Sequence, residues 1–228
     1  MATELIWLGH GTWEIAAEGG RVVLDPFLDD NPVAAKTADQ VEADYILISH
    51  GHYDHMADAE KIARRTGATI IGCYEICEYF RRRGIERVCP MNIGGTCQQP
   101  FGRVKMTPAW HSSTLPDGTP GGAAAGFLLF LPEGNAYFAC DTALMQDMTL
   151  IGRVGLEIAV LPIGDNFTMG PEDALEAVRL LKPRRVVPVH VNTWPVIQQD
   201  VQSWAQQVQR ETQTEVILLQ PGQSLRLA

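Results

Sequence analysis

The sequence of 228 residues has no hydrophobic run that is long enough to cross a membrane as a helix. Its longest apolar run extends from Ala123 to Leu131, far short of the roughly 20 residues that a membrane helix needs. The start of the chain also lacks a basic segment followed by an apolar one, which argues against a signal peptide. We therefore expect a cytoplasmic protein that has no membrane partner.

Basic residues are scarce, and the cysteines show no metal-binding or disulfide pattern. Lys and Arg number 18 against 27 Asp and Glu, for a formal net charge of −9, so a basic groove for nucleic acid is not expected. The five cysteines are an odd number and include no Cys-x-x-Cys spacing. We expect reduced and mostly buried thiols rather than a disulfide framework or a zinc ribbon.

The sequence does contain an alternation of strand-like and helical segments. Three short segments at the start, Leu5 to Leu8, Thr12 to Ala16 and Arg21 to Leu24, are separated by glycine-containing turns and predict an antiparallel meander. Further strands are predicted at 45–48, 69–72, 87–89, 103–107, 126–131, 136–139, 158–161, 185–189, 215–219 and 224–227, and helices at 58–66, 74–83, 144–151, 171–181 and 197–210.

No linker or repeat divides the chain, so we predict one α/β domain over residues 1–228, with mixed sheets and outer helices. Two segments, Leu28 to Gln40 and Ser112 to Ala123, are longer than ordinary connections. Such loops often serve as lids or binding loops.

The strongest local signal is the motif His50-Gly-His52-Tyr-Asp54-His55. It puts four potential metal ligands into six residues directly after an apolar strand. A polar surface loop would explain any one of these histidines, but three of the six histidines of the chain lie here. Imidazole and carboxylate donors packed so closely suit zinc, manganese or iron.

Other candidate ligands also follow predicted strands. His111 comes shortly after the strand at 103–107, Asp141 follows the strand at 136–139, and His190 ends the strand at 185–189. Open α/β sheets place their sites at the carboxyl ends of strands. Each histidine alone would more often be structural, but together they predict a metal site.

These residues and several phrases resemble the metallo-β-lactamase superfamily. The order His50-x-His52-x-Asp54-His55, His111, Asp141, His190 follows its signature over the whole chain. The phrases Trp7-Leu-Gly-His10, Leu24-Asp25-Pro26-Phe27, Pro162 to Pro171 and Pro188 to Thr193 are similar to metal-dependent hydrolases close to L-ascorbate-6-phosphate lactonase. The resemblance implies a four-layer αββα sandwich of two mixed sheets with outer helices.

The resemblance also implies a ligand set for two divalent metal ions, zinc first and manganese or iron as alternatives. His50, His52 and His111 would hold one ion, Asp54, His55 and His190 would hold the other, and Asp141 would bridge them. A bridging hydroxide would then attack the substrate. Asp54 would act as the catalytic residue that takes up the proton and delivers it to the leaving group.

Four more residues are candidates for supporting or substrate-contacting roles. Asp25 would hydrogen-bond a ligand histidine or would simply form a turn before proline. His10 would contact substrate or would be structural, and Trp110 and Trp194 would line the pocket or belong to the core. Cys140, next to Asp141, is expected to face away from the metals because neighbouring strand residues point to opposite faces.

The leading functional prediction is hydrolysis of a small-molecule ester, lactone or phosphoester. Basic residues near the motifs are too scarce to name a phosphate clamp. A di-iron redox protein, an RNA-processing nuclease and a non-catalytic metal-binding protein remain as alternatives. The resemblance argues against the redox class, whose members usually carry Glu where His52 stands and need a flavin domain. The net charge of −9 argues against the nuclease. The substrate, the native metal and the oligomeric state stay open, and a homo-oligomer is one option.

Overall fold

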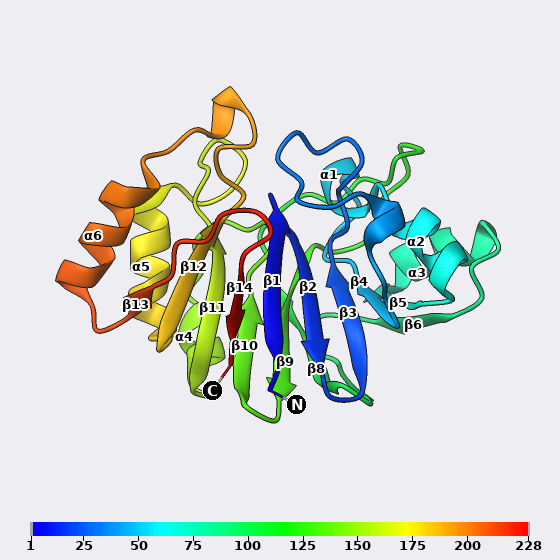
Figure 1. Ribbon diagram of the computed structural model, residues 1–228, viewed down its shortest axis with the longest axis horizontal. Helices are drawn as coiled ribbons and strands as arrows, with labels where there is room; N and C mark the ends of the chain where they lie inside the picture. Colours follow the sequence, from blue (N-terminus) through cyan, green and yellow to red (C-terminus); the bar gives the residue numbers. More distant parts are fainter. Residues whose placement is uncertain (1, 228) are drawn as a thin grey trace.

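The computed structural model describes residues 2–227 and contains two seven-stranded sheets (Figure 1). The first sheet has the order β14 (Ser224–Arg226), β1 (Glu4–Gly9), β2 (Thr12–Ala17), β3 (Gly20–Leu24), β4 (Tyr45–Leu47), β5 (Thr69–Cys73) and β6 (Val88–Met91). The second has the order β13 (Glu215–Val216), β12 (Arg185–Val189), β11 (Leu156–Pro162), β10 (Gly134–Phe138), β9 (Ala125–Leu131), β8 (Gly102–Pro108) and β7 (Thr96–Gln99).

Both sheets are mixed in the same way. In the first sheet β1, β2 and β3 pair antiparallel, as the predicted meander requires, and β3 to β6 pair parallel. In the second sheet β7 to β10 pair antiparallel, and β10 to β13 pair parallel. Alternate strands of an antiparallel run share a direction. The carboxyl ends of β1, β3 and β4 therefore lie on the same side of the first sheet, and those of β8, β10 and β12 on the same side of the second.

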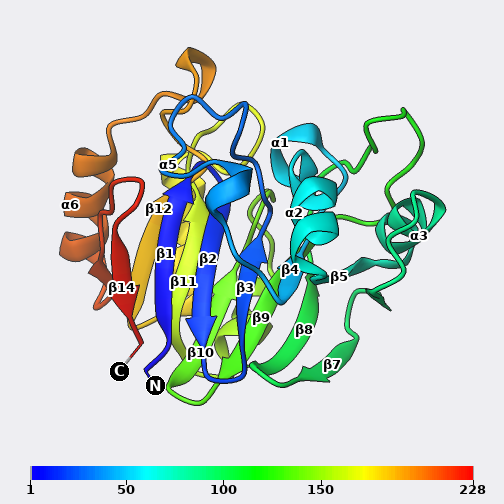
Figure 2. The same cartoon turned by 45° about the vertical axis from the view of Figure 1, so that its right-hand side comes forward.

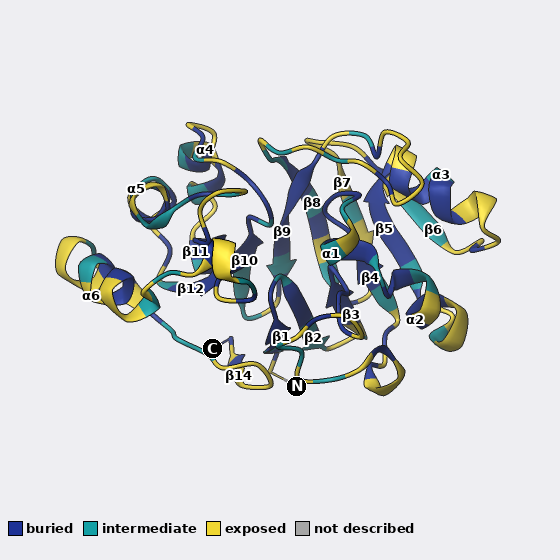
Figure 3. Ribbon diagram, turned by 90° about the horizontal axis from the view of Figure 1, so that it is seen from above, coloured by how far each residue is buried: buried dark blue, intermediate teal, exposed yellow. Residues whose placement is uncertain are grey.

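The helices form the two outer layers (Figure 3). α2 and α3 pack against β5 and β6 of the first sheet, whereas α5 contacts β11 and α6 contacts β13 of the second. The helices are α1 (Tyr53–Met56), α2 (Ala59–Thr66), α3 (Tyr74–Arg82), α4 (Met148–Gly152), α5 (Pro171–Leu181) and α6 (Val201–Glu211), with short 3₁₀ turns η1 (Ala38–Gln40) and η2 (Pro195–Ile197). The predicted four-layer sandwich is confirmed.

β9 and β11, in the middle of the second sheet, are buried on both faces, which explains their nearly continuous apolar sequences. In β9, Phe127 and Leu129 belong to the core that includes the facing sides of both sheets, while Leu128 belongs to the core beneath α4, α5 and α6. The same alternation occurs in β11, where Val160 lies in the first core and Leu161 in the second. Two packed layers therefore hold the strand ends in place.

Several predicted boundaries are wrong, and each error has a local cause. β7 was not predicted because its sequence, Thr-Cys-Gln-Gln, is polar and it lies at the sheet edge. The predicted helix at 197–210 begins instead at Val201, since the Asp200 side chain accepts a hydrogen bond from the Ser203 amide and caps it. The predicted helix at 144–151 is only Met148–Gly152, and the strand at 215–219 ends at Val216.

Two further sequence-based expectations concern the membrane and the thiols. Within residues 2–227, no helix has the length and apolar character that crossing a membrane requires. All five cysteines are free thiols. Cys73 and Cys77 are buried, and the other three, Cys89, Cys97 and Cys140, are partly buried.

Candidate metal centre

Figure 2 shows β1 and β3 ending at the upper side of the molecule. The candidate residues His10, Asp25, Asp141 and His190 lie in the connections that follow β1, β3, β10 and β12. At four positions in these connections, His10, Asp25, Cys140 and His190, the backbone has a left-handed φ between 46° and 53°. Such conformations are costly for residues other than glycine and concentrate at functional sites. A Cβ on Gly164 would clash with the carbonyl oxygen of His190, so this glycine lets the chain after β11 approach the His190 turn.

His50, His52 and His111 form the first group of donor atoms. The His52 Nδ1 lies 3.0 Å from the His50 Nε2 and 3.2 Å from the His111 Nε2. Tetrahedral zinc with bonds of about 2.05 Å holds its nitrogen ligands roughly 3.3 Å apart. The three nitrogens therefore have nearly the spacing that one metal ion would impose.

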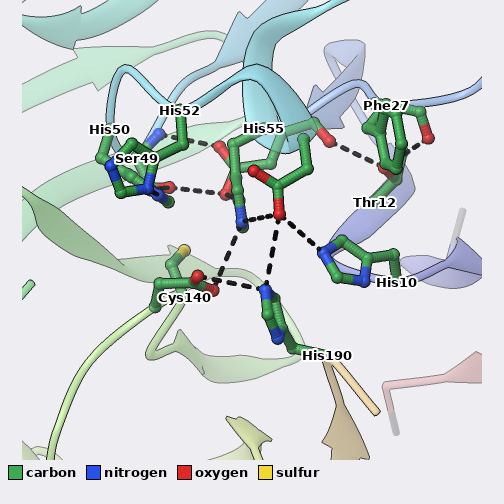
Figure 4. Close-up of polar contacts among 12 residues, drawn as sticks. His10, Thr12, Phe27, Ser49, His50, His52, His55, Cys140 and His190 are labelled. Carbon is green, nitrogen blue, oxygen red and sulfur yellow. Dashed lines mark hydrogen bonds and ion pairs between the residues drawn. The ribbon is translucent and has the colours of Figure 1, made fainter. Parts of the chain in front are cut away.

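Asp54, His55 and His190, with His10 beside them, form the second group. Figure 4 shows the rings of His10, His55 and His190 directed toward one point. The Asp54 Oδ2 lies 3.8 Å from the His55 Nε2 and 3.7 Å from the His190 Nε2. Both of these nitrogens are buried and have no hydrogen-bond partner. Buried polar atoms are rarely left unpaired, and a cation bound between them would satisfy both.

Asp141 lies between the two groups. Its carboxylate oxygens are 3.4 Å from the His55 Nε2, 3.1 Å from the His190 Nε2 and 3.6 Å from the His111 Nε2. The side chain is buried. All seven residues that the resemblance assigns as metal ligands are thus brought together, with Asp141 in a bridging position.

The carboxylates and two of the histidines perturb one another strongly. Although burial opposes charge, His190 and His55 hold the pKa of Asp141 well below its usual range. Burial also opposes the charge of His55, but Asp141 and Asp25 outweigh it and raise the pKa of His55 well above 6.5. At His190, Asp141 outweighs burial in the same way and raises the pKa to about 9. Protons on these imidazoles neutralise the carboxylates where cations would otherwise do so.

Burial acts in the opposite direction on the first group. It lowers the pKa of His50 well below 6.5, and it lowers the pKa values of His52 and His111 as well. These three imidazoles are neutral at neutral pH. Neutral imidazole is the form that binds metal.

Asp25 and Ser49 orient two of the ligand rings. Asp25 accepts hydrogen bonds from the His55 Nδ1 at 2.9 Å and from the Ser49 hydroxyl at 2.6 Å. The Ser49 oxygen lies 2.9 Å from the His50 Nδ1, so it accepts that N–H. Both rings therefore turn Nε2 toward the metal positions, which is the supporting role predicted for Asp25. The contribution of Ser49 was not predicted, although its place directly before His50 is a signal.

His10 is buried and contacts Asp54 rather than the cavity. Burial lowers its pKa to about 4, so the ring is neutral at pH 7. Its Nε2 donates to the Asp54 Oδ2 at 3.1 Å, and its Nδ1 accepts from the Thr193 hydroxyl at 2.8 Å. Of the two alternatives for His10, the geometry favours the structural one, in which the ring orients Asp54. Thr193 was missed because its partner His10 is 183 residues away.

Cys140 does not join either group of donors. It packs against the core that includes the facing sides of the two sheets, and burial raises the pKa of its thiol well above the ordinary value. A protonated thiol is a poor ligand. As expected, Cys140 is not among the candidate ligands, but it lies beyond the end of β10 with a left-handed φ, so strand alternation is not the reason.

A cavity of about 800 Å³ opens beside the candidate ligands. Trp194 lines this cavity, which agrees with the pocket-wall alternative predicted for it. Trp110 does not line it and is 71% exposed, so its assignment to the core is wrong and the pocket-wall alternative finds no support. The two long loops contribute Asp30 and Ser112. Phe167 comes from the segment Pro162 to Pro171, which carried the resemblance but no site prediction, and Val196 comes from η2.

Comparisons with known proteins place this fold and site in a class. The sequence model described as "Beta-lactamase superfamily domain" matches residues 20–191. The chain belongs to this superfamily, and it is a metal-dependent hydrolase. The metal-dependent hydrolase group that the motifs indicated is confirmed: the chain is 47% identical to the UPF0173 metal-dependent hydrolase TTHA1283 of Thermus thermophilus, over 98% of this chain and 99% of that protein. It is 44% identical to MK1542 of Methanopyrus kandleri, over 96% and 98%.

Solved structures agree with this assignment. Igni18, a metallo hydrolase from Ignicoccus hospitalis, has a TM-score of 0.91 and 32% identity and covers 100% of this chain and 99% of its own. CmlA, a diiron β-hydroxylase from Streptomyces venezuelae, has a TM-score of 0.79 at 17% identity and covers 99% of this chain and 54% of its own. At that identity the likeness to CmlA shows the fold alone.

Proposed function

We propose that the protein is a dinuclear hydrolase that acts on a small-molecule ester, lactone or phosphoester. The observation that carries this proposal is the pairing of two donor groups across Asp141, together with the buried Nε2 atoms of His55 and His190, which make no hydrogen bond. Imidazole and carboxylate donors suit zinc, which we favour, and also manganese or iron. A single domain and a cytoplasmic location are part of the same proposal.

The residues around the ligands have distinct tasks in this proposal. Bound divalent ions would supply Lewis acidity and would lower the pKa of water. The hydrogen bonds from Asp25 and Ser49 fix the rings of His55 and His50. The Asp54 side chain is a quarter exposed and lines the cavity, so it can take a proton from the nucleophile and give it to the leaving group.

The alternative functions have less support. The likeness to the diiron enzyme CmlA is one of fold alone, and fold does not fix the reaction. The formal charge of −9 is unfavourable for an RNA substrate, so we favour a small molecule.

Metal removal and restoration test the proposal. The protein stripped of metal by a chelator, with removal verified by elemental analysis, should not hydrolyse phenyl acetate, a six-membered lactone or bis(4-nitrophenyl) phosphate. Zinc, manganese or iron should restore turnover of at least one of them, each to a different extent. A rate that survives verified removal would refute metal dependence. A loaded protein that turns over none of the three would refute the proposed substrate classes.

A further inference from the structure

The cavity beside the metal ligands has an apolar wall. Phe27, Phe167, Trp194 and Val196 line it, together with the ring of Tyr53. Tyr53, Phe167 and Val196 are each more than half exposed, with exposed fractions of 52%, 54% and 53%. Exposed apolar side chains that gather at one place usually mark a binding surface.

Several contacts hold this wall in place. The Thr12 hydroxyl donates to the Asp25 carbonyl at 2.7 Å and accepts from the Phe27 amide at 3.1 Å, which fixes the turn that carries Phe27. The Tyr53 hydroxyl donates to the Asp30 carboxylate. The ring of Phe27 lies 6.0 Å from the rings of both Tyr53 and Trp194, within the range of aromatic pairs.

Phe167 stands on a turn that contains two left-handed residues. The two residues before it, Asp165 and Asn166, both have a left-handed φ, of 62° and 55°. A turn of this kind that presents an exposed aromatic ring to a cavity is better explained by ligand contact than by folding, because the ring remains in water.

Apart from the candidate metal ligands, the described residues that line the cavity offer no positive charge. No Lys or Arg is among the residues that line it, and beyond the candidate metal ligands its one charged side chain is Asp30. Proteins that bind phosphate or carboxylate groups usually supply Arg or Lys for them. An anionic group held away from the metals would meet Asp30 and an apolar surface.

We propose that the substrate is an uncharged ester or lactone with an apolar or aromatic substituent, held by the wall of Phe27, Tyr53, Phe167, Trp194 and Val196, and that Asp30 selects against anionic substituents. This inference rests on the proposed function, because it assumes that the reacting group lies at the metal ligands. It excludes phosphorylated compounds from the proposed substrate classes.

Binding of three hydroxamates to the zinc-loaded protein, measured by calorimetry, tests this inference without turnover. All three compounds share the metal-binding group. Benzohydroxamate should bind at least about tenfold more tightly than acetohydroxamate, because its ring buries apolar surface. It should also bind about tenfold more tightly than 4-carboxybenzohydroxamate, which places an anion in the cavity.

Variants assign the selectivity to named residues. Phe167→Ala should weaken benzohydroxamate binding and leave acetohydroxamate unchanged, whereas Asp30→Asn should improve binding of the carboxylate compound alone. Leu150→Ala is the matched control, since Leu150 is 56% exposed on α4 and does not line the cavity. It should change none of the three affinities.

The outcomes separate the two proposals. Equal affinities for the three compounds, tighter binding of the carboxylate compound, or binding of none of them would overturn the inference about the substrate. The expected selectivity together with no ester or lactone hydrolysis would refute the proposed function and leave the selectivity of the cavity established.

Discussion

Replacing Asp54 with asparagine is expected to lower kcat/KM by at least about 100-fold, the range for loss of a general acid or base. The Asp54 Oδ2 accepts a hydrogen bond from the His10 N–H and lies near the rings of His55 and His190. These three neighbours stabilise the ionised carboxylate. Although burial opposes ionisation, the hydrogen bond from His10 and the nearby rings of His190 and His55 hold the pKa of Asp54 well below its usual range. The amide keeps the size and one oxygen of the carboxylate but cannot accept a proton.

The measurement combines steady-state kinetics with metal content. Metal content is expected to fall less than kcat/KM, since the other ligands of the site remain. Asp39→Asn is the control, because Asp39 is a surface carboxylate paired with Lys61 and the same charge is removed. Full activity of Asp54→Asn at full metal occupancy would show that this residue does not transfer the proton.

The affinity of the group that contains His55 and His190 for metal is expected to rise by up to about 100-fold per pH unit near pH 7. In the metal-free protein the pKa of His190 is about 9 and that of His55 is higher than 6.5 by a wide margin, so both rings carry a proton at this pH. Metal binds neutral imidazole and must displace both protons, and each displaced proton contributes about tenfold per pH unit. His50, His52 and His111 add little, because burial lowers their pKa values.

Calorimetric titrations with zinc at pH 7, in two buffers that differ in ionisation enthalpy, count the released protons. About two protons should leave the unaltered protein per chain, whereas His190→Ala, which should bind only the ion of the first group, should release close to none. Proton release near zero in the unaltered protein would mean that His55 and His190 are already neutral without metal.

The sequence predicted those parts of the fold that depend on local pattern. The apolar run in β9 and the meander of β1 to β3 follow from alternation and turn residues. β7 could not be predicted, since its stability comes from pairing with β8 rather than from its own polar sequence. The start of α6 depends on the Asp200 cap, which a helical pattern alone does not locate.

The same division applies to the site. The ligand candidates could be predicted because they are chemically distinctive and follow strands that end at one edge. The roles of Thr193 and His10 depend on a contact across 183 residues. Phe167 and Val196 form the cavity wall only because their loops meet there, and neither residue type signals this in a sequence.

Metal content at saturation tests the central claim, that the two donor groups sharing Asp141 bind two divalent ions. The metal-free protein would be equilibrated with excess zinc, freed of unbound metal and measured by elemental analysis against protein concentration. We predict about two ions per chain, falling to about one in both His50→Ala and His190→Ala because each variant weakens a different group. A ratio near zero in the unaltered protein would contradict the metal centre, and a ratio near one would contradict its dinuclear character.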